Sequence, residues 1–225
     1  MTLNRLIGHT LADMRGMSPL IHCITNYVTA GDTANMLLAA GASPIMADDP
    51  AESAEITAIA QGLTLNLGTP SASRVEAMLR SGEKAAERGI PVIFDPVGVA
   101  CSEFRRNSAA EIISRVKLTA VRGNLSELSY LAGFSGKERG VDSSDTGISP
   151  ETAAKAAAER LGCVCAVTGA YDVISDGMRN AIIRNGTPLL KKITGAGCLT
   201  SALCAAFCSV SDGFTGTAAG IAFMD

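Results

Sequence analysis

The feature that most constrains the fold is the regular alternation of short apolar runs with helical stretches. The apolar runs are continuous rather than interleaved with polar residues, which is typical of strands buried on both faces of a parallel sheet. The expected strands are Leu20–Ile24, Pro44–Ala47, Leu63–Leu67, Val92–Asp95, Thr119–Arg122 and Val164–Thr168. The expected helices are Thr33–Ala40, Glu52–Ala60, Ser71–Arg88, Glu103–Lys117, Glu127–Ala132 and Glu151–Leu161. Strands that alternate with such helices predict an α/β fold with a mostly parallel central sheet and helices on both faces.

The alternation changes in the last third of the sequence. Asp172–Ser175 and Asn180–Arg184 flank a turn and predict a small antiparallel hairpin over residues 172–184. The stretch Gly133–Pro150 is polar and rich in Gly and Ser, but the strand–helix alternation resumes after it. We therefore expect a loop there rather than a linker, and a single domain over residues 1–225.

Charge and composition narrow the function classes. The chain carries 19 Lys and Arg against 22 Asp and Glu, without a basic run, which argues against a nucleic-acid partner. No apolar run reaches the ~18 residues of a membrane span, and no signal peptide precedes the first strand. We expect no membrane partner and a cytoplasmic location.

The seven Cys form no C-x-x-C pair and are accompanied by only two His, so zinc is not expected. All Cys except Cys198 are expected to be small buried thiols.

A glycine-rich turn leads directly into an apolar helix near the end of the sequence. Residues 193–199 read Ile-Thr-Gly-Ala-Gly-Cys-Leu, and the expected helix is Leu199–Val210. The first N–H groups of a helix have no internal partner and carry a partial positive charge. The amides of Gly195, Ala196 and Gly197 could therefore hold a phosphoryl group. A plain loop-to-helix turn would explain the same glycines, and the absence of G-K-[ST] excludes a P-loop.

Polar residues also follow several expected strands, where ligands of open α/β sheets bind. Asp95 ends an apolar strand and is either a ligand position or a turn cap. Glu127 follows Asn124 by three residues, so it could hold Mg²⁺ directly or through water, beside phosphate oxygens. A capping box made by the same two residues is the alternative, and both roles can hold together. Thr168 and Gly169 end another strand, where a simple β-turn is the alternative.

Together these motifs resemble the hydroxyethylthiazole kinase family of the ribokinase superfamily. The matching stretches, in family order, are Ile24-Thr25-Asn26, Thr33-Ala34-Asn35, residues 38–46 (Leu-Ala-Ala-Gly-Ala-Ser-Pro-Ile-Met), Leu65-Asn66-Leu67-Gly68-Thr69, Asp95-Pro96-Val97-Gly98, Arg122-Gly123-Asn124, Glu127, Thr168-Gly169 with Asp172, and residues 194–198 (Thr-Gly-Ala-Gly-Cys). The Gly-Ala-Ser-Pro-x-Met and Gly-x-Gly-Cys motifs are specific in combination, and neither is specific alone.

The resemblance implies a ribokinase-like fold, ATP as co-substrate, Mg²⁺, and a homotrimer with sites between subunits. The implied reaction moves the γ-phosphoryl group of ATP to the primary alcohol of 4-methyl-5-(2-hydroxyethyl)thiazole, in thiamine biosynthesis or salvage. By motif, Met46 and Gly195 would contact the thiazole. Asn26 and Gly68 would line the same pocket.

The resemblance also assigns the groups around the phosphates. Arg122, Thr168 and Asn124 would bind the nucleotide. Asp95 and Glu127 would organise Mg²⁺.

Cys198 would lie beside the acceptor hydroxyl, where most ribokinase relatives carry an Asp that acts as general base. A helix N-terminus is expected to lower the pKa of this thiol, and a nearby phosphate to raise it again. A weak base suffices if the alcohol loses its proton late in the transfer. An inert buried thiol is the alternative.

Two departures from the family bear on these expectations. Residues 99–102 read Val-Ala-Cys-Ser, where the family has small Gly, Ala or Thr residues. The family chain also runs some tens of residues further, so we expect its C-terminal helices to be missing and apolar surface to be exposed around Leu199–Met224. The rival enzymes are superfamily kinases for hydroxymethylpyrimidine or pyridoxal and an ATP-dependent dehydratase, which usually keep Asp at the position of Cys198. The other rival is a nucleotide- or thiazole-binding protein with little activity.

Overall fold

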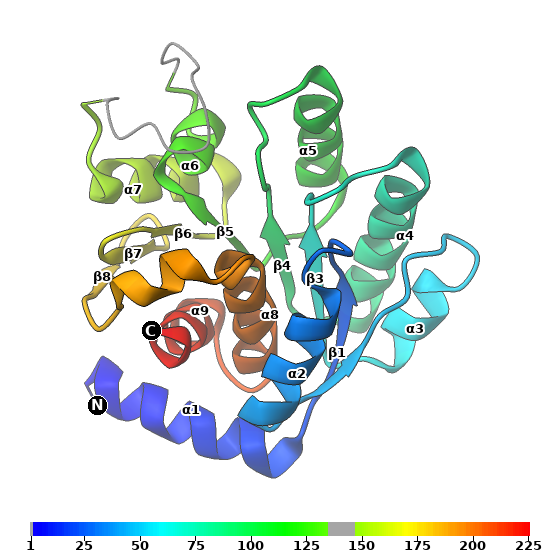
Figure 1. Cartoon of the computed structure of the whole chain (residues 1–225), viewed down its shortest axis with the longest axis horizontal. Coiled ribbons are helices and arrows are strands. Elements are labelled where there is room, and N and C mark those ends of the chain that lie inside the picture. The colour runs from blue at the N-terminus through cyan, green and yellow to red at the C-terminus, as the bar shows by residue number, and fades with distance from the viewer. Residues whose placement is uncertain (1, 135–146) are drawn as a thin grey trace.

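A twisted eight-stranded sheet lies at the centre of the computed structural model, which describes residues 2–134 and 147–225 (Figure 1). Within the described residues the strand order is β2-β1-β3-β4-β5-β6-β7-β8. The strands are β1 (Leu20–Ile24), β2 (Ser43–Ile45), β3 (Gly62–Asn66), β4 (Val92–Asp95), β5 (Ala120–Asn124), β6 (Val164–Thr168), β7 (Asp172–Ser175) and β8 (Asn180–Ile183).

The first six strands of the chain, β1 to β6, are all parallel. Strand β7 pairs antiparallel with β6, and β8 pairs antiparallel with β7. The hairpin register pairs Asp172 with Ile183 and Ser175 with Asn180. Both the mostly parallel sheet and the hairpin are confirmed. They could be predicted because the parallel strands are mostly apolar, whereas β8 alternates exposed and buried residues.

Helices cover both faces of the sheet. The helices are α1 (Leu3–Met17), α2 (Ala30–Ala40), α3 (Ser53–Ile59), α4 (Ala72–Arg88), α5 (Glu103–Arg115), α6 (Leu125–Leu131), α7 (Pro150–Leu161), the 3-10 helix η1 (Pro188–Lys192), α8 (Ala196–Cys208) and α9 (Gly213–Met224). One apolar core joins the sheet to α4, α5, α6 and α7, and a second joins it to α1, α2, α8 and α9. In the described part of the chain, no helix combines the length and the hydropathy that a membrane crossing needs.

Three element boundaries differ from expectation in ways that affect the site. Helix α8 begins at Ala196 rather than Leu199, so Cys198 lies in its first turn. Strand β3 ends at Asn66 rather than Leu67, which makes Asn66 the residue at the carboxyl end of that strand. Strand β5 extends to Asn124, which then caps α6.

Other differences concern elements away from the site. Helix α1 and η1 are not expected from the sequence. The predicted loop Gly133–Pro150 falls mostly outside the described residues, and at its end Pro150 already begins α7. Cys101 is exposed and Cys163 is half-buried, so the prediction of a buried thiol is wrong for Cys101.

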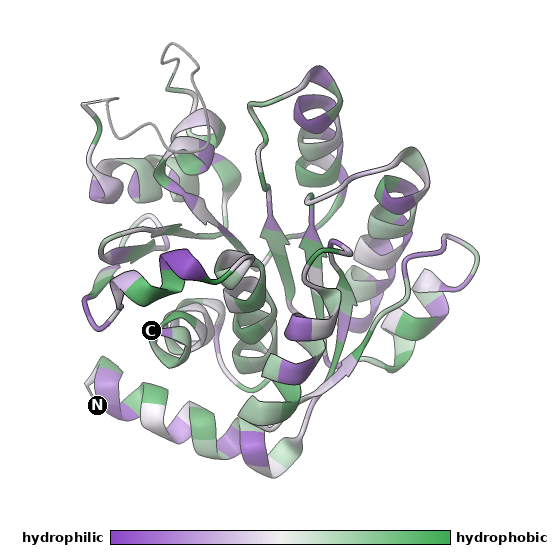
Figure 2. Cartoon of the chain, in the orientation of Figure 1, coloured by the Kyte–Doolittle hydropathy of each residue, from purple (hydrophilic) through white to green (hydrophobic). Residues whose placement is uncertain are grey.

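The apolar surface expected around Leu199–Met224 is largely buried instead. In α8 every residue from Leu199 to Cys208 is buried, and α9 is buried from Phe214 to Ile221 (Figure 2 shows both helices as apolar). The physical reason is close helix packing: a Cβ at Gly216 or Gly220 would lie 2.6 Å from the backbone of α8, so only glycine allows this approach. Helix α1 then packs on α9 and covers its outer side.

Candidate active site

The residues singled out by sequence gather at the carboxyl ends of the parallel strands, where the first turn of α8 also lies. This placement follows from the topology, because the carboxyl ends of neighbouring parallel strands share one edge of the sheet. Asn66 ends β3, Asp95 ends β4, and Thr168 ends β6. Arg122 lies in β5, two residues before its end.

The first turn of α8 requires its glycines for two different reasons. Gly195 is the N-cap residue with a φ of 76°, and a Cβ there would collide with the Thr29 side chain. A Cβ at Gly197 would collide with the guanidinium of Arg122. The first hydrogen bond within the helix runs from the Leu199 N–H to the Gly195 carbonyl at 3.0 Å. The amides of residues 196–198 therefore precede the hydrogen-bonded turns, and a guanidinium lies against them.

Asp95 is a buried carboxylate with one oxygen bound and one free. The Ser201 hydroxyl donates to Oδ2 at 2.8 Å, and Nη1 of Arg122 lies 3.7 Å from the same oxygen. Oδ1 has no hydrogen-bond partner within residues 2–134 and 147–225. Burial raises the pKa of Asp95 to about 6, against the opposing effect of the Arg122 charge. A free, buried carboxylate oxygen of this kind is suited to an added cation.

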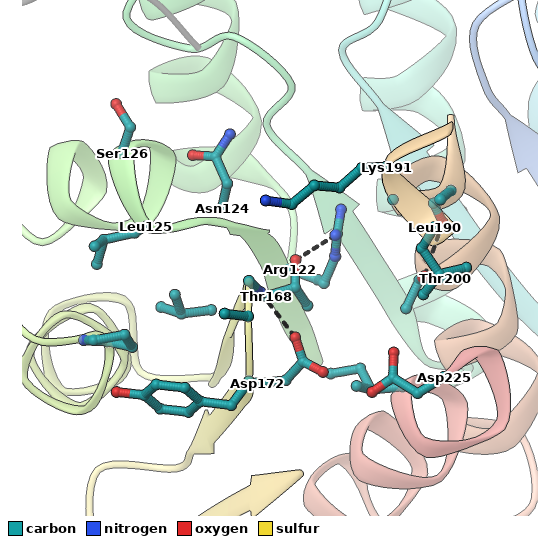
Figure 3. A pocket seen from close by; sticks show the side chains of 18 residues that line it. Arg122, Asn124, Leu125, Ser126, Thr168, Asp172, Leu190, Lys191, Thr200 and Asp225 are labelled. Atoms are coloured by element: carbon teal, nitrogen blue, oxygen red, sulfur yellow. Dashed lines mark hydrogen bonds between the residues drawn. The ribbon is translucent and has the colours of Figure 1, made fainter. Parts of the chain in front are cut away.

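Arg122 borders a cavity of about 520 Å³ and donates from Nη2 to the Thr168 hydroxyl. Figure 3 shows Lys191 reaching from η1 into the same space, with Asn124 on the opposite side. Asp172 forms part of the wall and accepts a hydrogen bond from the Gly169 N–H at 2.9 Å. Its pKa is raised to about 7, first by burial and then by the neighbouring Asp225 carboxyl group. The predicted nucleotide residues Arg122, Asn124 and Thr168 are thus brought together around one cavity.

A second polar cluster joins the strand ends to Cys198. The Asn26 amide nitrogen donates to Asn66 Oδ1 at 3.1 Å and to the Cys198 sulfur at 3.2 Å. The Gly68 N–H donates to the same Asn66 oxygen at 2.8 Å. A Cβ at Gly68 would lie 2.7 Å from both Asn26 Cβ and Asn66 Oδ1, so the cluster closes only around glycine. Three of the predicted residues, Asn26, Gly68 and Cys198, are therefore in one hydrogen-bonded unit.

The pKa of the Cys198 thiol is raised, so the predicted lowering at a helix N-terminus is wrong. Burial is the largest cause, and the neighbouring Asp95 charge acts in the same direction. The Asn66 and Asn26 amides near the sulfur and the charge of Arg122 favour the thiolate but are outweighed. Sequence spacing reveals the helix terminus, whereas the depth of the thiol and the approach of Asp95 depend on the tertiary fold.

Asn124 and Glu127 form the capping box of α6. The Glu127 N–H donates to Asn124 Oδ1 at 2.9 Å, and Glu127 Oε2 accepts from the Asn124 N–H at 2.8 Å. Glu127 Oε1 accepts from the Gly98 N–H at 2.8 Å, which ties the loop after β4 to α6. The capping alternative is confirmed, and the Mg²⁺ role of Glu127 stays a prediction. Among the residues that the structure describes, no group of three or more His, Cys, Asp or Glu could hold a metal by itself.

Met46 lies just beyond β2 and is 38% exposed. Its loop is linked to the Gly68 loop by Arg74, which forms an ion pair with Asp48 at 2.5 Å and donates to the Thr69 carbonyl at 2.9 Å. The two segments expected to contact the thiazole are therefore fixed relative to one another.

Sequence reasoning missed Asn66, Ser201 and Lys191. Asn66 could have been found, since it is a polar residue at the end of an otherwise apolar strand. Ser201 follows Cys198 by three residues and shares its helix face, but its partner Asp95 is 106 residues away. Lys191 lies in a short 3-10 helix that has no clear sequence signal.

Comparison with known proteins identifies close relatives. The sequence profile of the Hydroxyethylthiazole kinase family matches residues 11–224. The hydroxyethylthiazole kinase of Ruminiclostridium cellulolyticum is 49% identical over 222 residues, which is 97% of this chain and 81% of that protein. The solved hydroxyethylthiazole kinase structure of Pyrococcus horikoshii superposes with a TM-score of 0.88 at 36% identity, covering 96% of this chain and 82% of the other. A ribokinase-like superfamily protein of Enterococcus faecalis matches in fold, with a TM-score of 0.65 at 10% identity, covering 100% of this chain and 84% of the other.

Proposed function

The chain belongs to the hydroxyethylthiazole kinase family, and from this premise we propose the reaction that it catalyses. It transfers the γ-phosphoryl group of ATP to the primary alcohol of 4-methyl-5-(2-hydroxyethyl)thiazole, a step in thiamine biosynthesis or salvage. The observation that carries this proposal is the meeting of Arg122, Asp95 and Cys198 at the first turn of α8. A cation, a free carboxylate oxygen and a thiol surround one group of unpaired helix amides.

Phosphoryl transfer requires in-line positioning and neutralisation of charge more than covalent chemistry by the protein. The amides of residues 196–198 point their partial positive charge at the transferred group, and the Arg122 guanidinium lies beside them. Both the amides and the guanidinium are fixed before substrate binds, so no reorganisation is needed at the moment of transfer.

Cys198 positions the acceptor hydroxyl in this proposal. Its raised pKa keeps the thiol neutral at neutral pH, so it can accept and donate a hydrogen bond but is a poor general base. The Asn26 amide fixes the direction of the sulfur through its 3.2 Å contact. A loose transition state deprotonates the alcohol late, which allows a site with a weak base to work.

ATP occupies the cavity that Arg122, Thr168 and Asn124 border, with its phosphates directed to α8. Asp95 and Glu127 organise Mg²⁺, which would neutralise charge on the β- and γ-phosphates. The free Oδ1 of Asp95 fits a cation, either directly or through water. Each Glu127 oxygen already accepts one backbone N–H, so Glu127 is best placed to act through a water molecule. The remaining ligands would be phosphate oxygens and water.

The thiazole occupies the space between Met46, Gly68, Asn26 and Gly195, and the active enzyme is a cytoplasmic homotrimer. The soft, adaptable side chain of Met46 suits a small sulfur heterocycle. Several large apolar side chains are exposed in the segment from residue 27 to residue 46. They are Tyr27 (72% exposed), Val28 (58%), Leu38 (59%) and Met46 (38%). Exposed apolar side chains along this segment favour a subunit interface, and those of Tyr27, Val28 and Met46 favour one that closes over the thiazole.

The direct test is product identification. Purified protein is incubated with Mg²⁺-ATP and the thiazole alcohol, and phosphorus NMR follows the phosphate monoester and ADP. Equimolar ester and ADP are expected, with no ester from 4,5-dimethylthiazole, which lacks the hydroxyl. ATP hydrolysis without ester, or ester formation only from pyridoxal or hydroxymethylpyrimidine, would contradict the proposal. The relatives and Cys198 both favour the thiazole alcohol over those two rival substrates.

A further inference from the structure

His22 is a fully buried histidine that the proposed mechanism does not use. It lies in β1 with none of its surface exposed, among strands that are otherwise almost entirely apolar. Nε2 lies 2.8 Å from the Ala47 carbonyl oxygen, and Nδ1 lies 2.9 Å from the Thr57 hydroxyl. A buried imidazole is costly unless both nitrogens are bonded, so this network has a specific geometry.

The hydrogen-bond partners determine the tautomer. The Ala47 carbonyl can only accept, so Nε2 must carry a proton and donate to it. Burial lowers the pKa of His22 and favours the neutral ring, so Nδ1 has a lone pair and accepts from the Thr57 hydroxyl. The hydroxyl of Thr57 has a single proton, which also faces the Ser53 carbonyl oxygen at 2.9 Å and is therefore shared between these two acceptors. Helix α3 thus holds the ring in the orientation that aims Nε2–H at Ala47.

The carbonyl that His22 holds belongs to the residue after Met46. On the other side of Met46, Ile45 is paired in register with His22 itself. Met46 is therefore anchored on both sides by the same strand, through backbone pairing before it and through the imidazole after it. The Asp48–Arg74 ion pair completes the anchoring at the surface.

We propose that His22 is a positioning residue that sets the location of Met46, and with it the affinity and selectivity for the thiazole, by donating from Nε2 to the Ala47 carbonyl. This inference rests on the proposed function, because it assumes that Met46 contacts the substrate. It concerns the thiazole side of the site alone, since no hydrogen bond within the described residues links His22 to Arg122 or Asp95. His22 does not touch the reacting atoms.

The experiment compares His22→Gln with His22→Leu. The Gln amide can place a donor near the position of Nε2, whereas Leu fills a similar volume without one. We expect KM for the thiazole alcohol to rise about tenfold in His22→Leu, with kcat and KM for ATP within twofold of the unsubstituted protein. His22→Gln should restore KM to within about threefold. A general loss of stability would instead change kcat and both KM values together.

Two more variants test the same inference without changing His22, in case His22→Leu folds poorly. Thr57→Val removes the hydroxyl that orients the ring and should raise KM for the thiazole by a few-fold. Thr64→Val removes a buried hydroxyl of β3 that has no hydrogen-bond partner in the described part of the chain, and should leave KM unchanged. Equal effects of the two Val variants would overturn the inference.

A second measurement does not depend on activity. The methyl resonance of Met46, assigned by its loss in Met46→Leu, is followed in protein labelled at the Met methyl carbon without substrate. The resonance should move in His22→Leu and stay close to its original position in His22→Gln. An unmoved resonance in His22→Leu would overturn the inference even where the thiazole is phosphorylated. A moved resonance in a protein that never phosphorylates the thiazole would instead count against the proposed function.

Discussion

Two side chains at the site differ from their usual behaviour because the fold buries them. Asp95 is 1% exposed with a pKa raised to about 6, and the pKa of Cys198 is raised above its ordinary value. In both residues burial is the largest cause. The pKa values of both groups therefore depend on their removal from water, and an added cation would partly offset this effect at Asp95.

Asp95→Asn should stabilise the free protein while removing most of its activity. Between pH 3.8 and about 6 the folded state keeps a proton on Asp95 that the unfolded state has released. The free energy of unfolding of the wild type therefore falls as the pH rises through this range. The Asn variant lacks this loss. The free energy of unfolding of the Asn variant should exceed that of the wild type increasingly over this pH range. Above about pH 6 the difference should stay constant, at about 1–3 kcal/mol. The measurement is urea denaturation without Mg²⁺ and ATP between pH 4 and 8.

The same variant should lower kcat by about 100-fold, because the oxygen that would meet the cation is replaced. Asp13→Asn, at an exposed position in α1, is the matched control and should change neither quantity. If the Asp95→Asn protein were less stable than the wild type at every pH, ionised Asp95 would contribute to stability through Arg122, contrary to this account.

Cys198→Ala should retain a kcat within about tenfold of the wild type, because amides and Arg122 provide most of the stabilisation and the thiol only positions the hydroxyl. KM for the thiazole alcohol should rise by a few-fold. Steady-state kinetics with Cys204→Ala as a control, further along α8, separates this effect from helix repacking. A loss of more than about 1,000-fold in a folded Cys198→Ala protein would assign the thiol a role as general base.

The sequence predicts some of these residues and misses others for a physical reason. Asp95 and Thr168 could be found because the carboxyl ends of parallel strands lie at the same edge of the sheet, independently of the conformation of the loops. The partners that shift their properties come from elements far away in the chain. Ser201 reaches Asp95 from α8, and Asn26 reaches Cys198 across 172 residues. No local pattern encodes such approaches.

At the scale of elements, Glu127 joins the loop after β4 and the end of β5 to helix α6. Its carboxylate accepts the backbone N–H groups of Gly98 and Asn124, so a single side chain caps α6 and fixes the loop after β4. Glu127→Ala leaves both N–H groups without this acceptor and should lower the free energy of unfolding by about 1–3 kcal/mol. Chemical denaturation without Mg²⁺ measures this. Glu103→Ala, an exposed first-turn residue of α5, is the control and should have little effect.

The Mg²⁺ role of Glu127 requires a separate readout. Glu127→Gln can keep one of the two backbone contacts but loses the charge, so the Mg²⁺ concentration for half-maximal rate should rise several-fold. Were Glu127→Gln to show the wild-type dependence on Mg²⁺, Glu127 would be a capping residue alone.

Element types are easier to predict than element boundaries. The sequence places the start of α8 three residues late because Gly-Ala-Gly-Cys has low helix propensity, and tertiary contacts of Thr29 and Arg122 fix the first turn instead. Helix α1 escapes sequence prediction because it begins without a side-chain cap at Thr2 and buries only Thr10 and Met14 fully. Both failures arise where packing, not local preference, decides the structure.

At the scale of the whole molecule, the exposed apolar side chains predict assembly. Static light scattering of the wild type should give three times the chain mass of 23.1 kDa. Leu38→Asp should lower the mass of the assembly and raise KM for the thiazole alcohol. Met178→Asp is the matched control, since Met178 is 91% exposed on the turn between β7 and β8. A monomeric wild type that turns over normally, or equal dissociation by both variants, would contradict the proposed trimer.

The overall architecture is predictable, whereas assembly cannot be derived from the strand pattern. Continuous apolar strands require cover on both faces, and this alone predicts the two helical layers that the two cores show. An interface would use side chains such as Tyr27, Val28 and Leu38, whose exposure is known only after folding.

The most direct test of the central claim is the selectivity of one enzyme preparation. The claim is that the first turn of α8, Arg122 and Asp95 direct ATP phosphoryl transfer to the thiazole alcohol held near Met46. The value of kcat/KM for 4-methyl-5-(2-hydroxyethyl)thiazole is compared with that for pyridoxal, each with saturating Mg²⁺-ATP. The account predicts a preference of at least about 100-fold for the thiazole, which corresponds to ~2.7 kcal/mol in transition-state binding. Equal or reversed values would contradict it.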